Sequence, residues 1–515
     1  MVGNPLYGIW LHQMGGASCS KLVRAMVTVG MLVVIPIAIP VATASARSVT
    51  YVARDGDIIP GMRATQVVAP RGFFDALERA EKASTSSYSH ITTAVIPSFS
   101  RQTKLACSAC HYAFPQLTPF GRQFKLNGYV LTSLATIGEP ADSSGGLKLA
   151  PFPPVSAMIV ASATRTNNAQ SGTQNNTASF PQQASIFYAG QVTSHLGVFT
   201  QFTYTAADGK IGIDNVDVRY ARHATISDRD VLIGVTLHNN PTVQDVWNTT
   251  PAWGYPFMAS SVAPSPAAGT LIDGALAQQV VGLGVYTLFN DVLYAEATAY
   301  RSAPQGSTMP FDSTATNTTN GVIPYWRLAL QHQIGPTYMM VGTYGFAANL
   351  YPQGVSGKTN RYTDVGVDAQ VEHSVGTTSV IGRATYIHEQ QHLDALFTQA
   401  SQGAQSLQPT LSTVRANVSF LSNQRYGATV GVFQTTGTSD TLLFAPGSLT
   451  GSRTGSPNTT GETAELTYNA WENTRFGLQY VRYSRFNGAS TSYDILGGRQ
   501  ASANNTLYAY TWLAF

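Results

Sequence analysis

The chain has 515 residues, of which only 11% are charged, whereas soluble globular proteins carry roughly 25%. Its formal net charge of +3 is too small for a nucleic-acid-binding surface, so no nucleic-acid partner is expected. A mean hydropathy of −0.02 excludes a bundle of membrane-spanning helices. Three cysteines are too few for a secreted scaffold stapled by disulfides.

The first feature in chain order is an apolar run over residues 25–41. Lys21 and Arg24 precede this run, and an A-x-A sequence ending at Ala46 follows it. A basic region, an apolar region and an A-x-A sequence are the three parts of a secretory signal peptide. The pattern predicts that residues 1–46 are a signal peptide and that the mature chain leaves the cytoplasm. Two prolines within the run disfavour the alternative, a single membrane anchor.

Cleavage at that point leaves two cysteines, and both lie in one motif, Cys107-Ser108-Ala109-Cys110-His111. In a C-x-x-C-H motif the two thiols bond covalently to one haem and the histidine ligates its iron. We therefore predict one covalently bound haem c, with His111 as the proximal ligand of the haem iron. The adjacent histidine and the export signal disfavour the alternative, a redox or structural dithiol.

A short helix is predicted directly after the motif. Thr118 suits its N-cap, Pro119 its first position and Gly128 its exit. Phe120 and Phe124 are four residues apart, on one face of this helix, and are expected to pack against the porphyrin. The alternative is that they pack only within their own small domain.

A sixth ligand of the haem iron, if there is one, comes from few residues. Residues 155–163 alternate in polarity, which places Met158 on the more polar face of a strand, away from lipid. Met158 is the candidate distal ligand, and His90 is the alternative. Methionine ligation raises the haem potential relative to a second histidine. An open site, with Met158 serving only in strand packing, is the third possibility.

From residue 151 onward, short segments alternate between apolar and polar residues. Val365, Val367 and Val371 alternate with Asp368, Gln370 and Glu372, and the same alternation occurs over residues 216–221, 326–331 and 414–420. One face suits lipid and the other a wet lumen. We therefore predict an all-β membrane protein.

The connections between these segments alternate in length. The tight turns lie at residues 194–197, 227–228, 290–291, 333–336, 374–376, 422–423 and 472–473. The long polar loops cover residues 166–183, 206–213, 239–275, 302–322, 348–361, 389–408, 436–462 and 485–502. This rhythm predicts an outer-membrane β-barrel of about 16 strands with short periplasmic turns and long outside loops. The alternating final strand, which ends in Phe515, resembles the C-terminal signature of such barrels.

The sequence therefore divides into three segments: the signal peptide, a monohaem cytochrome domain over residues 47–150, and the transmembrane β-barrel over residues 151–515. The cytochrome domain has one further predicted helix, Pro70 to Ala83, and little else to form a core. We expect it to enter the barrel from the periplasm and plug the lumen, with a loosely tethered periplasmic domain as the alternative.

Residues 101–111, 114–117 and 120–129 together resemble the fused outer-membrane monohaem cytochrome c–porin iron oxidases of iron-oxidising bacteria. The barrel is similar to theirs only in length, rhythm and ending. The resemblance implies an iron oxidase, of the Fe(II):cytochrome c oxidoreductase type. It also implies that extracellular Fe(II) gives its electron, through the haem, to a periplasmic cytochrome or copper protein.

No His and carboxylate cluster has the spacing of a tight iron site; His388, Glu389 and His392 are candidates, with a solvated loop as the alternative. The chain has 27 Asp and Glu but 30 Lys and Arg and 10 His, so full protonation leaves a charge of about +40. Its polar loops are neutral and keep their hydrogen bonding in acid. This composition indicates an acidophile's cell surface, where Fe(II) stays soluble.

Two other functions fit the same features. The conduit could run outward, delivering respiratory electrons to extracellular acceptors, which the haem potential would reveal. Alternatively, the protein could be a diffusion porin whose haem domain is structural or regulatory, which solute flux through the reconstituted barrel would reveal.

Overall fold

The structure is a computed structural model that describes residues 97–131, 153–169, 177–207, 209–241, 245–250, 254–274, 276–303, 308–309, 313–314, 317–352, 357–398 and 403–515. The predicted signal peptide, the predicted helix over residues 70–83 and His90 lie outside these residues. Within them, no helix has the length and apolar character needed to cross a membrane.

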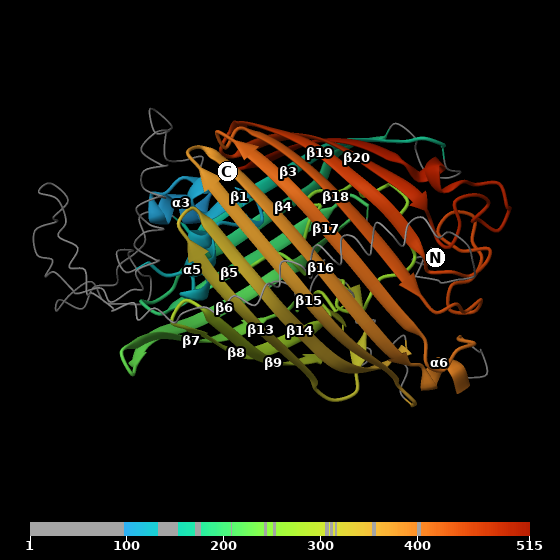
Figure 1. Ribbon diagram of the computed structural model, residues 1–515, viewed down its shortest axis with the longest axis horizontal. Coiled ribbons are helices and arrows are strands. Elements are labelled where there is room, and N and C mark those ends of the chain that lie inside the picture. The colour runs from blue at the N-terminus through green and yellow to red at the C-terminus, as the bar shows by residue number, and fades with distance from the viewer. Residues whose placement is uncertain are drawn as a thin grey trace, which may run out of the picture.

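Sixteen long strands form the wall of the molecule. They are β3 (Val155–Thr166), β4 (Thr177–Gln191), β5 (Leu196–Thr205), β6 (Lys210–Ile226), β7 (Arg229–His238), β8 (Val280–Phe289), β9 (Leu293–Ser302), β13 (Ile323–Ile334), β14 (Thr337–Tyr351), β15 (Asn360–Val375), β16 (Thr378–His392), β17 (Thr410–Ser422), β18 (Tyr426–Gly437), β19 (Thr459–Trp471), β20 (Thr474–Arg485) and β21 (Thr506–Ala514). Each pairs with its neighbour in the chain, antiparallel throughout, and β21 pairs with β3 to close the barrel. The predicted 16-stranded barrel is confirmed (Figure 1).

Short elements lie in the loops: β10 (Thr308–Met309), β11 (Ser313–Thr314), β12 (Thr318–Thr319), α6 (Asp394–Thr398) and the 3-10 helix η4 (Ala501–Asn504). All seven predicted tight turns fall at one end of the barrel, the short-turn end, and the long connections fall at the other, the long-loop end. Several strands are longer than the predicted ten residues. β14 extends to Tyr351 and β15 begins at Asn360, so the two strands take in both ends of residues 348–361, predicted as a loop, because their ladder continues through Asn349 and Arg361.

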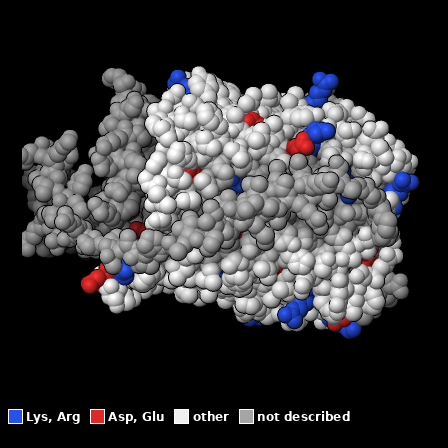
Figure 2. Space-filling view, in the orientation of Figure 1, with Lys and Arg blue, Asp and Glu red and all other residues white. Residues whose placement is uncertain are grey.

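The two faces of the wall differ as the alternation predicts. On β15, Val365 and Val367 are 46% and 49% exposed, whereas Asp368 and Glu372 are buried. The part of the outer wall visible in Figure 2 carries only scattered charged side chains. The bilayer core offers no hydrogen bonds to backbone N–H and C=O groups, and in a closed barrel these groups all pair with neighbouring strands. A closed barrel with an apolar exterior is the architecture of outer-membrane proteins, so the protein lies in an outer membrane.

Residues 97–131, the N-terminal segment, pack against the inner wall at the short-turn end (Figure 1). The segment contains α3 (Ser98–Thr103), α4 (Cys107–Cys110), β1 (His111–Ala113), β2 (Gln116–Leu117) and α5 (Pro119–Leu126). Ser98 Oγ donates to the carbonyl of Ala189 at 2.7 Å, and Tyr129 Oη donates to Asp217 Oδ2 at 2.6 Å. The described part of the predicted cytochrome domain thus lies within the barrel mouth.

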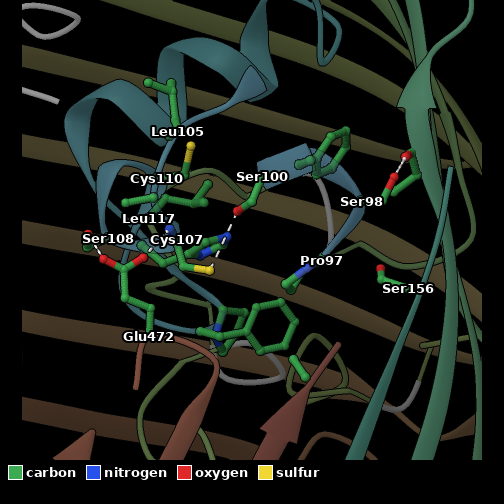
Figure 3. A pocket seen from close by; sticks show the side chains of 18 of the residues that line it. Pro97, Ser98, Ser100, Leu105, Cys107, Ser108, Cys110, Leu117, Ser156 and Glu472 are labelled. Carbon is green, nitrogen blue, oxygen red and sulfur yellow. Dashed lines mark hydrogen bonds between the residues drawn. The ribbon is translucent and has the colours of Figure 1, made fainter. Parts of the chain in front are cut away.

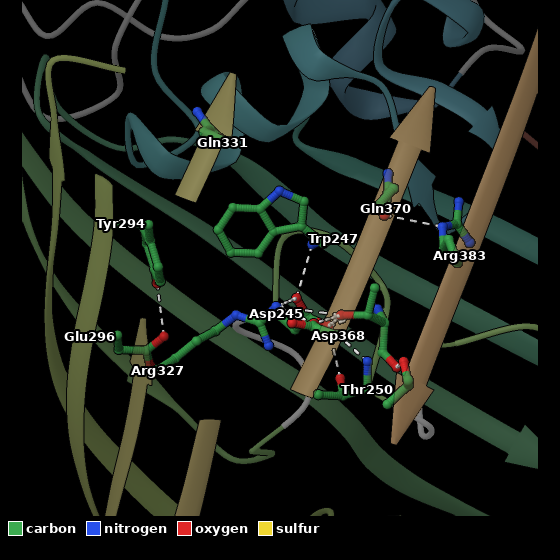
Figure 4. A network of polar contacts seen from close by, with 12 residues as sticks. Asp245, Trp247, Thr250, Tyr294, Glu296, Arg327, Gln331, Asp368, Gln370 and Arg383 are labelled. Atoms are coloured by element: carbon green, nitrogen blue, oxygen red, sulfur yellow. Dashed lines mark hydrogen bonds and ion pairs between the residues drawn. The ribbon is translucent and has the colours of Figure 1, made fainter. Parts of the chain in front are cut away.

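The connection from β7 to β8 does not extend outward as predicted for a long loop. Its described residues, 245–250 and 254–274, form what we call the lumen loop, in which Trp247 is 1% exposed. Asp245 accepts N–H bonds from Trp247, Thr249 and Thr250 and faces Arg327 of β13 (Figure 4). The lumen loop therefore occupies the lumen at this level, where the polar wall residues Arg327, Asp368 and Thr385 bond to it.

Gly366 of β15 gives room to an aromatic ring on the neighbouring strand. A Cβ added there would lie 2.5 Å from the Tyr344 ring, whereas one added at Gly382 of β16 would meet nothing within 4 Å. We expect Gly366→Ala to lower the free energy of unfolding by about 1–3 kcal/mol through overpacking. Urea unfolding in lipid vesicles, with Gly382→Ala as the matched control, measures this. Equal stability of the two variants would contradict the packing described.

Candidate haem site

The C-x-x-C-H motif is held by a turn of the barrel wall. Cys107 to Cys110 form the single helical turn α4, and His111 follows at its end. Glu472, in the tight turn between β19 and β20, accepts the Cys107 N–H at 2.8 Å and the Ser108 hydroxyl at 3.2 Å (Figure 3). Both thiols are free and half-buried. The motif therefore has a fixed orientation relative to the barrel before any group binds.

Helix α5 fixes the motif from the other side. As predicted, Thr118 caps the helix, accepting the Gly121 N–H at 3.1 Å, and Pro119 is its first residue. The Thr118 hydroxyl also donates to the carbonyl of Ala109 within the motif at 2.6 Å. A Cβ on Gly121 would lie 2.2 Å from the Cys110 carbonyl oxygen, so only glycine allows this close approach.

A cavity opens beside the two cysteines. Its empty volume is about 1440 Å³, including the mouth. The aromatic residues that line it, besides His111, are Phe99, Tyr112, Phe114, Phe124, Tyr129, Phe187, Phe199 and Trp512. Two thiols and a histidine in a large aromatic cavity suit a flat apolar macrocycle, so the residues present fit the predicted haem.

His111 provides a second test of this fit. Burial lowers the pKa of its imidazole to about 4, so the ring is neutral above that pH. A neutral imidazole is the form that ligates a metal.

Met158 reaches the same cavity from the barrel. It is 2% exposed, points inward from β3 as predicted, and lines the cavity together with His111. Its role as distal ligand stays a prediction. Phe124 also lines the cavity, whereas Phe120 is buried behind it in the cluster that includes Leu105.

A buried ion pair that sequence reasoning missed anchors the N-terminal segment. Arg122 of α5 donates to both carboxylate oxygens of Glu372 on β15, at 2.7 and 3.0 Å, and Tyr112 Oη donates to the same carboxylate at 3.2 Å. The Arg122 guanidinium also lies 4.2 Å from the centre of the Tyr338 ring. In the sequence, the one sign of this ion pair was the position of Glu372 on the inward face of an alternating strand.

The candidate iron residues do not converge. His388 and Glu389 are adjacent on β16 and point to opposite faces: His388 contacts Ser412, and Glu389 accepts the Leu271 N–H. His392 instead faces Asp394, at 3.5 Å. In the described part of the chain, no three His, Cys, Asp or Glu side chains are grouped as metal ligands.

Comparisons with known proteins concern the barrel. No protein-family profile matches the chain, and no curated protein matches it in sequence. The structure is similar to a loop L8 deletion mutant of OmpT, an outer membrane protein of Vibrio cholerae, at 10% identity over 70% of this chain and 98% of that one, with a TM-score of 0.39. It is also similar to the anion-selective porin from Comamonas acidovorans, at 11% identity over 70% and 98% of the two chains, with a TM-score of 0.38.

Removing Glu372 leaves the Arg122 charge buried and uncompensated. We expect Glu372→Ala to destabilise the folded protein by about 3–5 kcal/mol and to expose the N-terminal segment to protease. The control is Glu462→Ala, since the Glu462–Arg482 pair is more than half exposed and contributes at most about 1 kcal/mol. Unfolding titrations and limited proteolysis in vesicles measure both effects. A resistant Glu372→Ala segment would show that the ion pair does not anchor it.

Proposed function

We propose that the protein is an outer-membrane cytochrome c that oxidises extracellular Fe(II) and passes each electron to a periplasmic carrier. The observation that carries this proposal is the cavity, in which Cys107, Cys110 and His111 from the N-terminal segment meet Met158 of the barrel wall. In an even-stranded barrel, the short-turn end faces the periplasm. The cavity at that end suits exchange with a periplasmic cytochrome or copper protein.

The filled lumen favours electron transfer over solute transfer. Behind the cavity, Arg327 pairs with Asp368, and Arg219 pairs with Asp217 at 2.8 Å; all four side chains are buried. A diffusion porin of this strand number needs an open aqueous channel. Among the described residues, the N-terminal segment and the lumen loop occupy that space.

Each residue of the site has a distinct task in this proposal. A bound haem supplies reversible one-electron chemistry, which matches the Fe(II)/Fe(III) couple. Cys107 and Cys110 would hold it covalently, and the imidazole of His111 would ligate its iron. Met158 would be the second ligand of the iron and would favour a high potential. The aromatic walls exclude water from the site.

The long-loop end suits contact with iron in acid. Ferric products precipitate or react, so oxidation outside the cell keeps them away from the periplasm. The polar loops are rich in neutral side chains, which keep their hydrogen bonds when carboxylates protonate, consistent with an acidophile's outer membrane.

The first test mixes vesicle-inserted protein with Fe(II) at pH about 2 to 3. We expect rapid appearance of a ferrous c-type spectrum. His111→Ala should abolish the low-spin spectrum and the reaction while leaving barrel insertion intact, because the wall strands pair without His111. A haem that reacts with dithionite but not with Fe(II) would contradict iron oxidation.

The second test concerns the distal ligand. We expect Met158→Ala to lower the haem midpoint potential and to change the axial-ligand bands of the spectrum, because a methionine sulfur ligand favours the ferrous state. Val160→Ala is the matched control, since Val160 is buried on the same face of β3 but does not line the cavity. An identical potential in both variants would rule out ligation by Met158.

The second candidate function is a diffusion porin with a structural haem segment, which the number of wall strands favours. Planar-bilayer conductance separates the two. An iron oxidase with a filled lumen conducts ions poorly, whereas a diffusion porin shows stable open channels. An outward electron conduit would instead have a haem potential too low to accept electrons from Fe(II) in acid.

A further inference from the structure

A line of aromatic side chains starts at the candidate haem ligand and follows β21 away from the short-turn end. The His111 and Phe114 rings are 5.5 Å apart, Phe114 stacks on Trp512 at 5.8 Å, and Tyr510 stacks on Tyr508 at 5.4 Å. Trp512 and Tyr510 occupy successive inward positions of β21 and belong to one buried cluster, against which Phe114 packs. We call Phe114, Trp512, Tyr510 and Tyr508 the aromatic column.

A second aromatic group continues toward the long-loop end. Tyr483 and Phe486 are 4.9 Å apart, and Phe486 and Tyr493 are also 4.9 Å apart; we call these three residues the outer cluster. In the β20–β21 register, Tyr508 pairs with Gln479, so Tyr483 lies four residues beyond it. At about 3.3 Å per residue, this step measures about 13 Å along the strand.

Two asparagines bridge this step. Asn504 Nδ2 donates to the Tyr493 hydroxyl at 2.8 Å, and the Tyr483 N–H donates to Asn505 Oδ1 at 2.8 Å. Both asparagines directly precede β21, the strand that carries Tyr508. The aromatic column and the outer cluster are therefore joined through a short stretch of backbone and two hydrogen bonds.

If iron is oxidised outside and the cavity lies at the periplasmic end, electrons must cross the protein. From the level of Trp512 to that of Tyr483 is eight residues, or about 26 Å along the strand. Since the N-terminal segment and the lumen loop occupy the lumen, we take electrons, and not hydrated iron, to cover this distance. Contacting aromatic rings couple electronically far better than open gaps, so two groups of packed rings leave one step of about 13 Å, which the asparagines bridge.

We propose that the aromatic column and the outer cluster are the electron path from the long-loop surface to the haem cavity, an inference that rests on the proposed function. One electron leaves Fe(II), which becomes Fe(III) outside, and the ferric haem iron accepts it and becomes ferrous. No net bond forms or breaks, because a ring oxidised on the way returns to its starting state and takes back any phenol proton that it released. The periplasmic carrier then reoxidises the ferrous haem iron.

The opposite wall offers a matched control. Tyr300 of β9 and Tyr325 of β13 are also buried and lie 6.0 Å apart, yet neither lines the cavity. Tyr508 and Tyr510 do not line it either. Substitutions in both pairs therefore leave the residues that line the cavity in place, and the haem spectrum and midpoint potential should stay as in the unmodified protein.

The first measurement is the stopped-flow rate at which Fe(II), added on the long-loop side of vesicles, reduces the haem. We expect Tyr508→Leu combined with Tyr510→Leu to slow it about tenfold or more, and Phe at both positions to restore it within about twofold. Tyr300→Leu combined with Tyr325→Leu should leave it within about twofold. Equal rates in all variants would overturn the path while leaving iron oxidation standing.

The second measurement needs no iron. A ruthenium photo-oxidant attached through Leu496→Cys, at a side chain that is 83% exposed, withdraws an electron after a flash. In haem-loaded protein, we expect a tyrosine or tryptophan radical followed by oxidation of ferrous haem, both suppressed by the Leu pair at Tyr508 and Tyr510. If this holds while Fe(II) fails to react, the path stands and the proposed function fails. Haem oxidation indifferent to the Leu pair would overturn the path.

Discussion

The structure depends on one constraint: a polar inner wall within a membrane must be satisfied from inside the barrel. The bilayer leaves no alternative to closed pairing of the strands, and alternation then directs Asp217, Arg219, Arg327, Asp368 and Glu372 into the lumen. Such buried charges are costly unless they are paired and hydrogen-bonded. The N-terminal segment and the lumen loop supply partners for them, so the same contacts that stabilise the wall also fill its interior.

The candidate haem cavity is a consequence of this docking. The C-x-x-C-H motif and Phe124 come from the N-terminal segment, whereas Met158, Phe187 and Trp512 come from the wall. A segment of this size has little surface of its own to bury around a haem, because small domains bury a smaller share of their surface. The barrel thus completes the cavity, and Glu472 fixes the motif at its edge.

The occupied lumen also separates the passage of electrons from the passage of solutes. In our proposal, iron stays outside, where ferric products are harmless, and only electrons cross toward the periplasm. Aromatic side chains along β21 suit this division, since they are apolar enough to pack in a sealed interior and remain in contact over much of its length. The wall, the seal and the electron path would then be made by one set of packed residues.

By itself, the sequence determined the features that depend on neighbours in the chain. The C-x-x-C-H spacing, the Thr118 cap, the alternation, the seven turns and hence the barrel could all be predicted, because each rests on local geometry or a period of two. Only the tertiary structure decided which distant residues meet. Arg122 and Glu372 are 250 residues apart, Glu472 and Cys107 365 apart, and the lumen loop has the composition of an outside loop. No periodicity encodes such contacts, since they arise only when strand register and closure bring the residues together.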